Sequence, residues 1–191
     1  MSILQANFDL KAKVQVAIDR IRQFEPREGY WLAMSYGKDS EVVYDLAVRS
    51  FVKFDAHFNQ SLEPPELVYF GRQHYPTVKV EKQPGFNFYI KMAEKGFPLR
   101  QRRWCCEYMK EWGGSGRMVL TGVRWAESAS RKRNRKLVDT MSKSRISGEP
   151  KVCVNPIIDW TTKEVWEYLR VRQLPYCSLY DEGASGRYRG D

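Results

Sequence analysis

The sequence has little cysteine and no long apolar run. No stretch of its 191 residues approaches the length of a membrane span, and its N-terminus shows no signal-peptide pattern. The four cysteines share no repeated spacing, which argues against a disulfide framework. We therefore expect a protein of the reducing cytoplasm that makes no membrane contact and is not stabilised by disulfide bonds.

Acidic residues are the scarcer charge. The 32 lysines and arginines outnumber the 23 aspartates and glutamates, and the resulting net charge of +9 favours a polyanionic partner, either a nucleotide or a nucleic acid. One basic cluster contains Arg100, Arg102 and Arg103, and a second spans residues 131–136. We interpret the second as a solvated flap over a nucleotide and keep nucleic-acid binding by the basic loop 131–136 as the alternative.

A short polar segment, Ser-Tyr-Gly-Lys-Asp-Ser at 35–40, separates the apolar run 30–34 from the amphipathic stretch 41–52. This pattern predicts a strand, a tight turn and a helix. Such a turn directs backbone N–H groups and the positive helix end toward one point, where a phosphate group would bind. The glycine permits close approach, the lysine adds charge and the serines add donors. A solvated turn with an incidental lysine is the weaker alternative, and the spacing is not that of a Walker loop.

The rest of the chain alternates strand and helix patterns. Strands are predicted at 30–34, 52–58, 77–80, 117–123 and 151–158. Helices are predicted at 7–24, 41–52, 64–74, 87–95, 104–112 and from 161 onward. This alternation predicts one α/β domain over 1–183, an open, mostly parallel twisted sheet with helices on both faces, in which 1–24 supplies an N-terminal packing helix. We expect 124–150 to be a mobile loop with local structure and 184–191 to be a disordered tail.

Cys105 and Cys106 are adjacent in a stretch predicted to be helical, where neighbouring side chains project about 100° apart, so they are not expected to bridge each other. Burial as small apolar residues is one interpretation. Soft-metal ligation or thiol chemistry is the other, because Arg102, Arg103 and Lys110 would lower the thiolate pKa. The residues alone favour neither.

Segment 121–128 ends a predicted strand in Thr-Gly and continues into Arg124. Ligands of open α/β sheets bind at the carboxyl edge, where an arginine can hold phosphate or sulfate through two hydrogen bonds. Glu127 either orients this arginine or stays solvated, and Arg131 follows on the same loop. The sequence therefore predicts an anion contact by Arg124.

The 35–40 segment resembles the pyrophosphate-binding loop, S-x-G-K-D-S, of the adenine nucleotide alpha-hydrolase superfamily, although Tyr36 stands where glycine is common. Four later segments resemble the phosphoadenosine phosphosulfate (PAPS) reductase family, in which T-G-x-R-x-x-E-S-x-x-R, N-P-I-x-D-W and L-Y-D-E-G recur. These segments are 102–110, 121–131, 155–166 and 174–183. The resemblance spans about residues 30–183. Segments 55–59 and 64–68 are closer to phage and mobile-element members related to the sulfur-transfer proteins of DNA phosphorothioation.

The resemblance implies an adenine nucleotide ligand: ATP, PAPS or adenosine 5′-phosphosulfate (APS). The residues it assigns to nucleotide binding are Ser35, Gly37, Lys38, Asp39, Ser40, His57, Asn59, Gly122, Arg124 and Arg131. The residues it assigns to catalysis are Lys38, Arg124, Cys105 and Cys106. Asp39 would cap the helix or help to hold Mg²⁺ if the ligand is ATP. His57 would lie near the base or ribose with Asn59, although we favour a partly buried polar role for His57.

Two reactions agree with the resemblance. In reductases of this family, a cysteine thiolate attacks the sulfur of the sulfonucleotide, and a thioredoxin-like donor resolves the covalent product. In ATP pyrophosphatases, the loop holds the departing pyrophosphate while the α-phosphate is attacked, and a sulfur donor then displaces the nucleotide from its acceptor. We favour the first, an enzyme of sulfur metabolism, over the second, an ATP-dependent sulfurtransferase of nucleic acid.

The chain departs from the family in its cysteines. Iron–sulfur members combine Cys-Cys with a later Cys-x-x-Cys, and the four thiolates hold a [4Fe–4S] cluster. Here Cys105 and Cys106 are partial ligands at most, no cysteine follows Gly183, and the Glu-Cys-Gly-Leu motif of the reductases is absent. We therefore expect no cluster, and a non-catalytic nucleotide-binding module is the third functional hypothesis.

Overall fold

The computed structural model describes residues 3–99, 101–141 and 149–182. The expected tail at 184–191 and Arg100 of the first basic cluster lie outside these ranges. Among the helices in the described ranges, none combines the length and the apolar character needed to cross a membrane.

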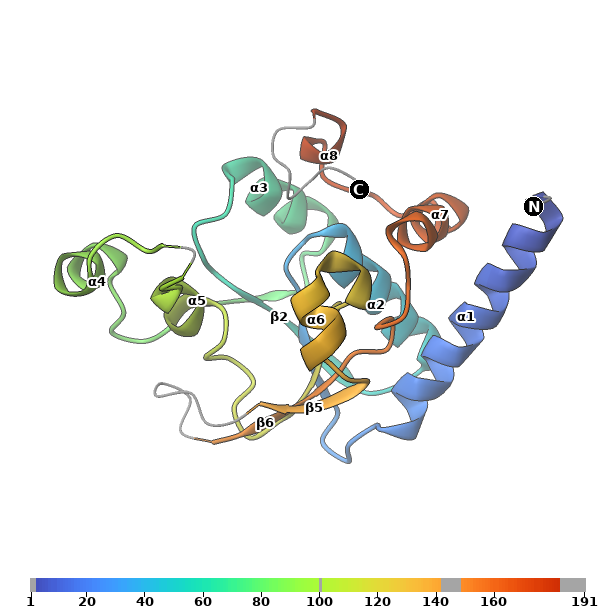
Figure 1. Ribbon diagram of the computed structural model, residues 1–191, viewed down its shortest axis with the longest axis horizontal. Coiled ribbons are helices and arrows are strands. Elements are labelled where there is room, and N and C mark those ends of the chain that lie inside the picture. The colour runs from blue at the N-terminus through green and yellow to red at the C-terminus, as the bar shows by residue number, and fades with distance from the viewer. Residues whose placement is uncertain (1–2, 100, 142–148, 183–191) are drawn as a thin grey trace.

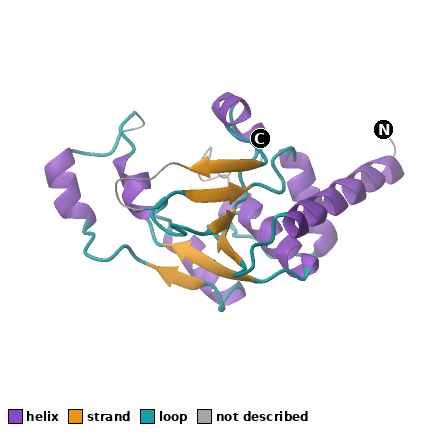
Figure 2. Cartoon of the chain, turned by 90° about the horizontal axis from the view of Figure 1, so that it is seen from below, coloured by secondary structure: helices purple, strands orange, loops and turns teal. Residues whose placement is uncertain are grey.

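Six strands form one sheet in the order β3-β2-β1-β4-β6-β5, and Figure 2 shows them stacked between the helices. The strands are β1 (Tyr30–Ala33), β2 (Phe54–Asn59), β3 (Lys79–Glu81), β4 (Met118–Leu120), β5 (Val138–Met141) and β6 (Lys151–Val154). Every neighbouring pair is parallel except β5 and β6, which are antiparallel. The prediction of a single α/β domain with a mostly parallel sheet is thereby confirmed.

Helices flank this sheet. They are α1 (Ile3–Gln23), α2 (Lys38–Ser50), α3 (Pro65–His74), α4 (Phe88–Lys95), α5 (Trp104–Met109), α6 (Ala129–Asn134), α7 (Thr162–Arg172) and α8 (Leu179–Glu182), with a 3₁₀ turn η1 (Trp125–Glu127). The α2 helix packs against both α1 and α7. In contrast, α4 and α5 lie to the left of the sheet in Figure 1, on the side opposite to α1.

Local sequence signals account for several of these elements. The apolar positions of α1 are buried as their helical spacing predicts, and they are Leu10, Val14, Ala17, Ile18 and Ile21. The α7 helix begins with a capping box, in which the Thr161 hydroxyl accepts from the Glu164 N–H and the Glu164 carboxylate accepts from the Thr161 N–H. These two helices therefore follow from their own sequences.

The stretch 124–150 contains more regular structure than the mobile loop that we expected. It holds η1, α6 and β5, while 142–148 lie outside the described residues. The β5 strand is short and lies at the sheet edge, so it needs no continuous apolar pattern and left no clear signal. Similarly, β6 ends at Val154 rather than at residue 158, and the chain turns at Asn155, whose Nδ2 donates to the Lys136 carbonyl at 2.8 Å.

The strand order reverses beside β1. The chain passes from β1 to β2 on one side and reaches β4 on the other side only later. In open α/β sheets such a switch point leaves a crevice at the carboxyl ends of the two strands, which is the usual place for a ligand. The Ser35–Ser40 loop follows β1 at this point, and Gly122 follows β4.

Candidate functional site

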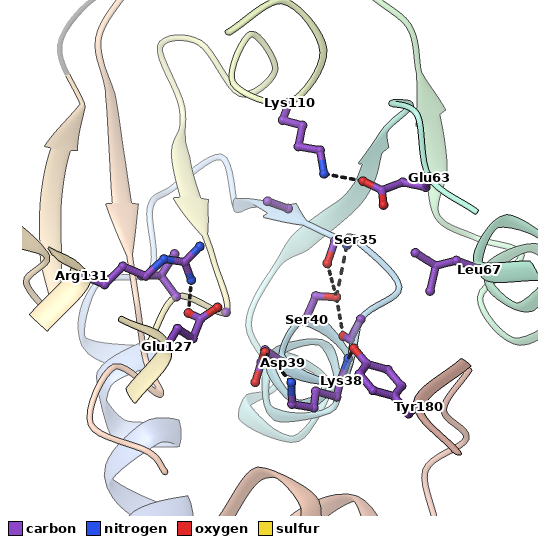
Figure 3. Close-up of a pocket in the computed structure, with 14 residues that line it drawn as sticks. Ser35, Lys38, Asp39, Ser40, Glu63, Leu67, Lys110, Glu127, Arg131 and Tyr180 are labelled. Carbon is purple, nitrogen blue, oxygen red and sulfur yellow. Dashed lines mark hydrogen bonds and ion pairs between the residues drawn. The ribbon is translucent and has the colours of Figure 1, made fainter. Parts of the chain in front are cut away.

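A cavity of about 270 Å³ occupies this crevice (Figure 3). Its lining combines the loop after β1 with side chains from four other regions. The lining residues are Ala33, Ser35, Gly37, Lys38, Asp39, Ser40, Glu63, Leu67, Lys110, Gly122, Val123, Glu127, Arg131 and Tyr180. Seven residues predicted for nucleotide binding are therefore brought together here: Ser35, Gly37, Lys38, Asp39, Ser40, Gly122 and Arg131.

Tyr36 fixes the path of the loop. Its φ of 56° lies in the left-handed region, which explains why glycine would suit this position. The side chain is buried and packs against Phe58, with ring centroids 4.5 Å apart. It also covers Gly71, where an added Cβ would lie 2.4 Å from the ring. The aromatic contacts hold a strained backbone that leaves Ser35 and Gly37 facing the cavity.

Hydrogen bonds close the loop onto the start of α2. The Ser40 hydroxyl accepts from the Ser35 N–H at 3.2 Å and donates to the Gly37 carbonyl at 2.8 Å. The helix begins at Lys38, three residues earlier than predicted, and Gly37 at the N-cap has no side chain to cap it. The positive end of α2 consequently borders the cavity, as an anion site requires.

Lys38 and Tyr180 form one wall of the cavity. The Lys38 side chain is nearly buried, with its Nζ 3.6 Å from Asp39 Oδ2 and 5.3 Å from the centroid of the Tyr180 ring. The Tyr180 hydroxyl accepts from the Lys38 N–H at 3.1 Å. An added Cβ at Gly37 would lie 3.2 Å from this hydroxyl. Tyr180 was not among the residues predicted for the site, although its Leu-Tyr-Asp-Glu-Gly segment was part of the family resemblance.

Arg124 does not line the cavity, contrary to the expected anion contact. Its side chain is 1% exposed, its Nε donates to Asp39 Oδ1 at 2.7 Å, and its Nη1 donates to the Trp160 carbonyl at 3.2 Å. The preceding Gly122 allows this approach, because a Cβ there would lie 2.8 Å from the Asp39 backbone. Arg124 therefore holds the first turn of α2 in place, with its guanidinium engaged by protein groups.

Two ion pairs border other parts of the cavity, one at the left and one at the top of Figure 3. Arg131 is paired with Glu127, and Lys110 is paired with Glu63. Lys110 and Glu63 were missed as cavity residues, because they come from distant segments whose meeting depends on the tertiary structure. Lys38, Lys110 and Arg131, the cations that line the cavity, thus each have a carboxylate neighbour.

His57 and Asn59 lie away from the cavity lining. His57 is 4% exposed, its Nδ1 is 2.9 Å from Glu81 Oε1, and its Nε2 contacts Asp55. Its ring stacks on Trp31 with centroids 3.4 Å apart. The Asn59 amide instead donates to the Lys110 carbonyl at 2.8 Å. Both residues are thus engaged by protein groups, and His57 occupies the buried polar role that we favoured.

Cys105 and Cys106 line a neighbouring hollow of about 290 Å³, here called the thiol hollow. Arg103 Nη2 lies 3.3 Å from Cys106 Sγ. Burial, reinforced by the adjacent Cys106, raises the pKa of the Cys105 thiol, whereas Arg103 opposes this shift. The interpretation in which nearby cations lower the thiol pKa is therefore wrong for Cys105, whose pKa is raised.

The thiols do not fit a four-thiolate cluster. Cys153 in β6 and Cys177 before α8 are buried, and within 3–99, 101–141 and 149–182 no three histidine, cysteine or acidic side chains gather closely enough to hold a metal ion. Asp39 does not fit the role of a Mg²⁺ ligand either, because its carboxylate is paired with Arg124 and Lys38.

Comparison with known proteins identifies a family for this chain. A profile of the phosphoadenosine phosphosulfate reductase domain matches residues 29–189. The adenosine 5′-phosphosulfate reductase of Oceanobacillus iheyensis is 31% identical over 166 residues, which are 79% of this chain and 65% of the relative. That of Geobacillus kaustophilus is 34% identical over 79% of this chain and 67% of its own length. The chain thus spans about two thirds of these relatives.

The fold agrees with a solved structure. The phosphate complex of phosphoadenylyl-sulfate (PAPS) reductase from Candida auris superposes with a TM-score of 0.61 at 20% identity, covering 96% of this chain and 93% of that one. At this identity the likeness concerns the fold. It supports the assignment of the six-stranded sheet and its flanking helices to one architecture.

Proposed function

Because the chain belongs to the phosphoadenosine phosphosulfate reductase domain family, we propose that its cavity binds the anionic end of an adenine sulfonucleotide. The observation that carries this proposal is the junction of β1 and α2, where Ser35, Lys38 and the uncapped start of α2 face one space. Backbone N–H groups and a helix N-terminus bind phosphate without any net positive charge on the wall. The similarity to two adenosine 5′-phosphosulfate reductases favours APS as the ligand.

Ligand binding would reorganise the rim. Lys38, Lys110 and Arg131 each lie beside a carboxylate, namely Asp39, Glu63 and Glu127. A phosphosulfate group that reached Lys110 and Arg131 would replace Glu63 and Glu127 as their partners, and a charge-assisted hydrogen bond to such a group is short and strong. Asp39 would stay with Arg124, because the guanidinium of Arg124 is buried and bonded to it.

The reaction class proposed is reduction of the sulfonucleotide by a thiol. A thiolate would attack the sulfur and form a sulfur–sulfur bond while the bond between the sulfur and the phosphate oxygen breaks, so that the nucleotide leaves with its phosphate. Cys105 and Cys106 line the thiol hollow and not the cavity, so we propose neither of them as the attacking thiol. The functions proposed for the cavity residues are binding, orientation and charge neutralisation.

Thermal unfolding in the presence of APS, PAPS and ATP tests the proposal. A ligand at 100 times its Kd stabilises the folded state by about 2.7 kcal/mol, which raises Tm by several degrees. We expect the largest rise with APS, its loss in Lys38→Ala and its partial recovery in Lys38→Arg. Lys163→Ala, an exposed lysine on α7, is the matched control and should respond like the parent. Absence of any rise in the parent with all three nucleotides would overturn the proposal.

A further inference from the structure

Two hollows continue the nucleotide cavity toward α4 and α5. The thiol hollow shares Glu63 and Lys110 with the cavity, so one ion pair is their common wall. A third hollow, of about 390 Å³, shares Ser61, Leu62 and Met109 with the thiol hollow. We name it the aromatic hollow. The three spaces therefore form a continuous row that extends outward from the carboxyl end of the sheet.

The aromatic hollow is walled by rings and amides. Its lining residues are Gln60, Ser61, Leu62, Lys82, Gln83, Phe86, Asn87, Phe88, Tyr89, Tyr108 and Met109. Phe86 stacks on Tyr108 with centroids 5.4 Å apart and planes inclined by 22°. Tyr89 is 73% exposed and meets Phe88 edge-on. A fixed pair of rings beside an exposed ring suits a flat aromatic ligand, because stacking requires an accessible face.

Gln83 gives this hollow an unused acceptor. Its Oε1 is shielded from solvent and has no hydrogen-bond partner among the described residues. A buried acceptor without a partner is unfavourable. A ligand that donates a hydrogen bond to it therefore gains more binding free energy than it would from an acceptor exposed to solvent. The amino groups and ring N–H groups of nucleobases are donors of this kind, and they lie in the plane that stacking leaves open.

The surroundings of the hollow are basic. The described residues between 82 and 110 contain six lysines and arginines against two glutamates. Lys91 and Lys95 lie over the Tyr108 ring, with Nζ atoms 5.5 Å and 5.6 Å from its centroid, while Arg102 and Arg103 are exposed on the approach to α5. Aromatic platforms beside a basic track are the arrangement that binds single-stranded nucleic acid.

We propose that the aromatic hollow binds a base of a single-stranded nucleic acid, whose phosphates follow Lys82, the lysines of α4 and the arginines that precede α5. A paired base is not accessible to such a hollow, because both its faces are stacked within the duplex. The surface is distinct from the basic loop 131–136, which contributes no residue to the lining of the aromatic hollow. The inference is independent of sulfonucleotide binding at the Ser35–Ser40 loop.

Fluorescence anisotropy with a labelled single-stranded 12-mer tests this site. Tyr89→Ala should weaken binding by about five-fold or more, since each stacked base contributes measurably to affinity. Tyr69→Ala, which removes a tyrosine of similar exposure (67%) on α3, is the matched control and should bind like the parent. Lys82→Ala should reduce the slope of log affinity against log salt by about 0.7 for one lost phosphate contact, and Lys163→Ala should leave it unchanged.

Several results would overturn the inference. They are a parent that binds no single strand, parental affinity in Tyr89→Ala, equal losses in Tyr69→Ala, and a duplex that binds as tightly as the single strand. Displacement of the 12-mer by equimolar 5′-AMP would also overturn it, by identifying a mononucleotide as the occupant. The rise in Tm with APS is measured for the same variants. A parent that binds the single strand but shows no rise with APS would contradict the proposal for the cavity and leave the inference about the aromatic hollow intact.

Discussion

Glu41 provides the sharpest test of the packing around the loop. It lies in the first turn of α2, its side chain is completely buried, and neither carboxylate oxygen has a hydrogen-bond partner within the described part of the chain. Burial, reinforced by the charge of Asp39 and opposed by Lys38, raises the pKa of Glu41 from 4.5 to about 9. We therefore expect a neutral carboxylic acid at physiological pH.

The sign of the pH dependence follows from proton binding. Between pH 4.5 and 9 the folded state retains a proton on Glu41 that the unfolded chain releases, so the free energy of unfolding falls as pH rises. The slope is about 1.4 kcal/mol per pH unit. At pH 7 the accumulated loss is about 3 kcal/mol, because 2.5 units separate this pH from the unfolded pKa.

Glu41→Gln removes this dependence while keeping a neutral side chain of the same size. The variant and the parent should have similar stability near pH 5, and the variant should become more stable by about 1.4 kcal/mol for each further pH unit. Urea unfolding followed by tryptophan fluorescence at pH 5, 6, 7 and 8 measures the difference. Glu66→Gln, at an exposed position in the first turn of α3, is the control. Parallel stability curves for the parent and Glu41→Gln would refute the reasoning.

Two further substitutions test the supports of the loop. Arg124→Met leaves Asp39 beside a buried apolar side chain, so the free energy of unfolding should fall by about 2–3 kcal/mol in urea titrations; a change below about 0.5 kcal/mol would contradict the role of Arg124 as a support. Gly71→Ala would place a methyl group against the Tyr36 ring, so the free energy of unfolding should fall by about 1–3 kcal/mol. Because the loop would shift, the affinity for APS should also fall. An unchanged Tm and Kd would show that Tyr36 does not fix the loop.

Structural features that depend on neighbouring residues were predicted correctly from the sequence. The alternation of strands and helices, the apolar face of α1 and the capping box at Thr161 depend on neighbouring residues, and all agree with the structure. The position of the Ser35–Ser40 loop between a strand and a helix followed for the same reason. Short elements without periodicity were not recovered, as β5 illustrates, since an edge strand is defined by its partner and not by its own pattern.

The partners of charged side chains required the tertiary structure. Arg124 had the sequence context of an anion ligand, yet it is buried against Asp39, 85 residues earlier in the chain. Lys110 and Glu63 were not expected at the cavity, and Cys105 carries a raised thiol pKa because burial outweighs the nearby Arg103. Residue type states what a side chain is able to bind, whereas the folded chain decides which partner it meets.

The sequence by itself thus determined the α/β architecture, the family and the location of the Ser35–Ser40 turn between a strand and a helix, because each is encoded in short segments with their own geometry. The tertiary structure alone decided that Tyr180, Lys110 and Glu63 complete the cavity, that Arg124 and His57 are buried, and that the thiols line a separate hollow. The reason is that burial and ion pairing depend on contacts between residues far apart in the chain, which no local pattern specifies.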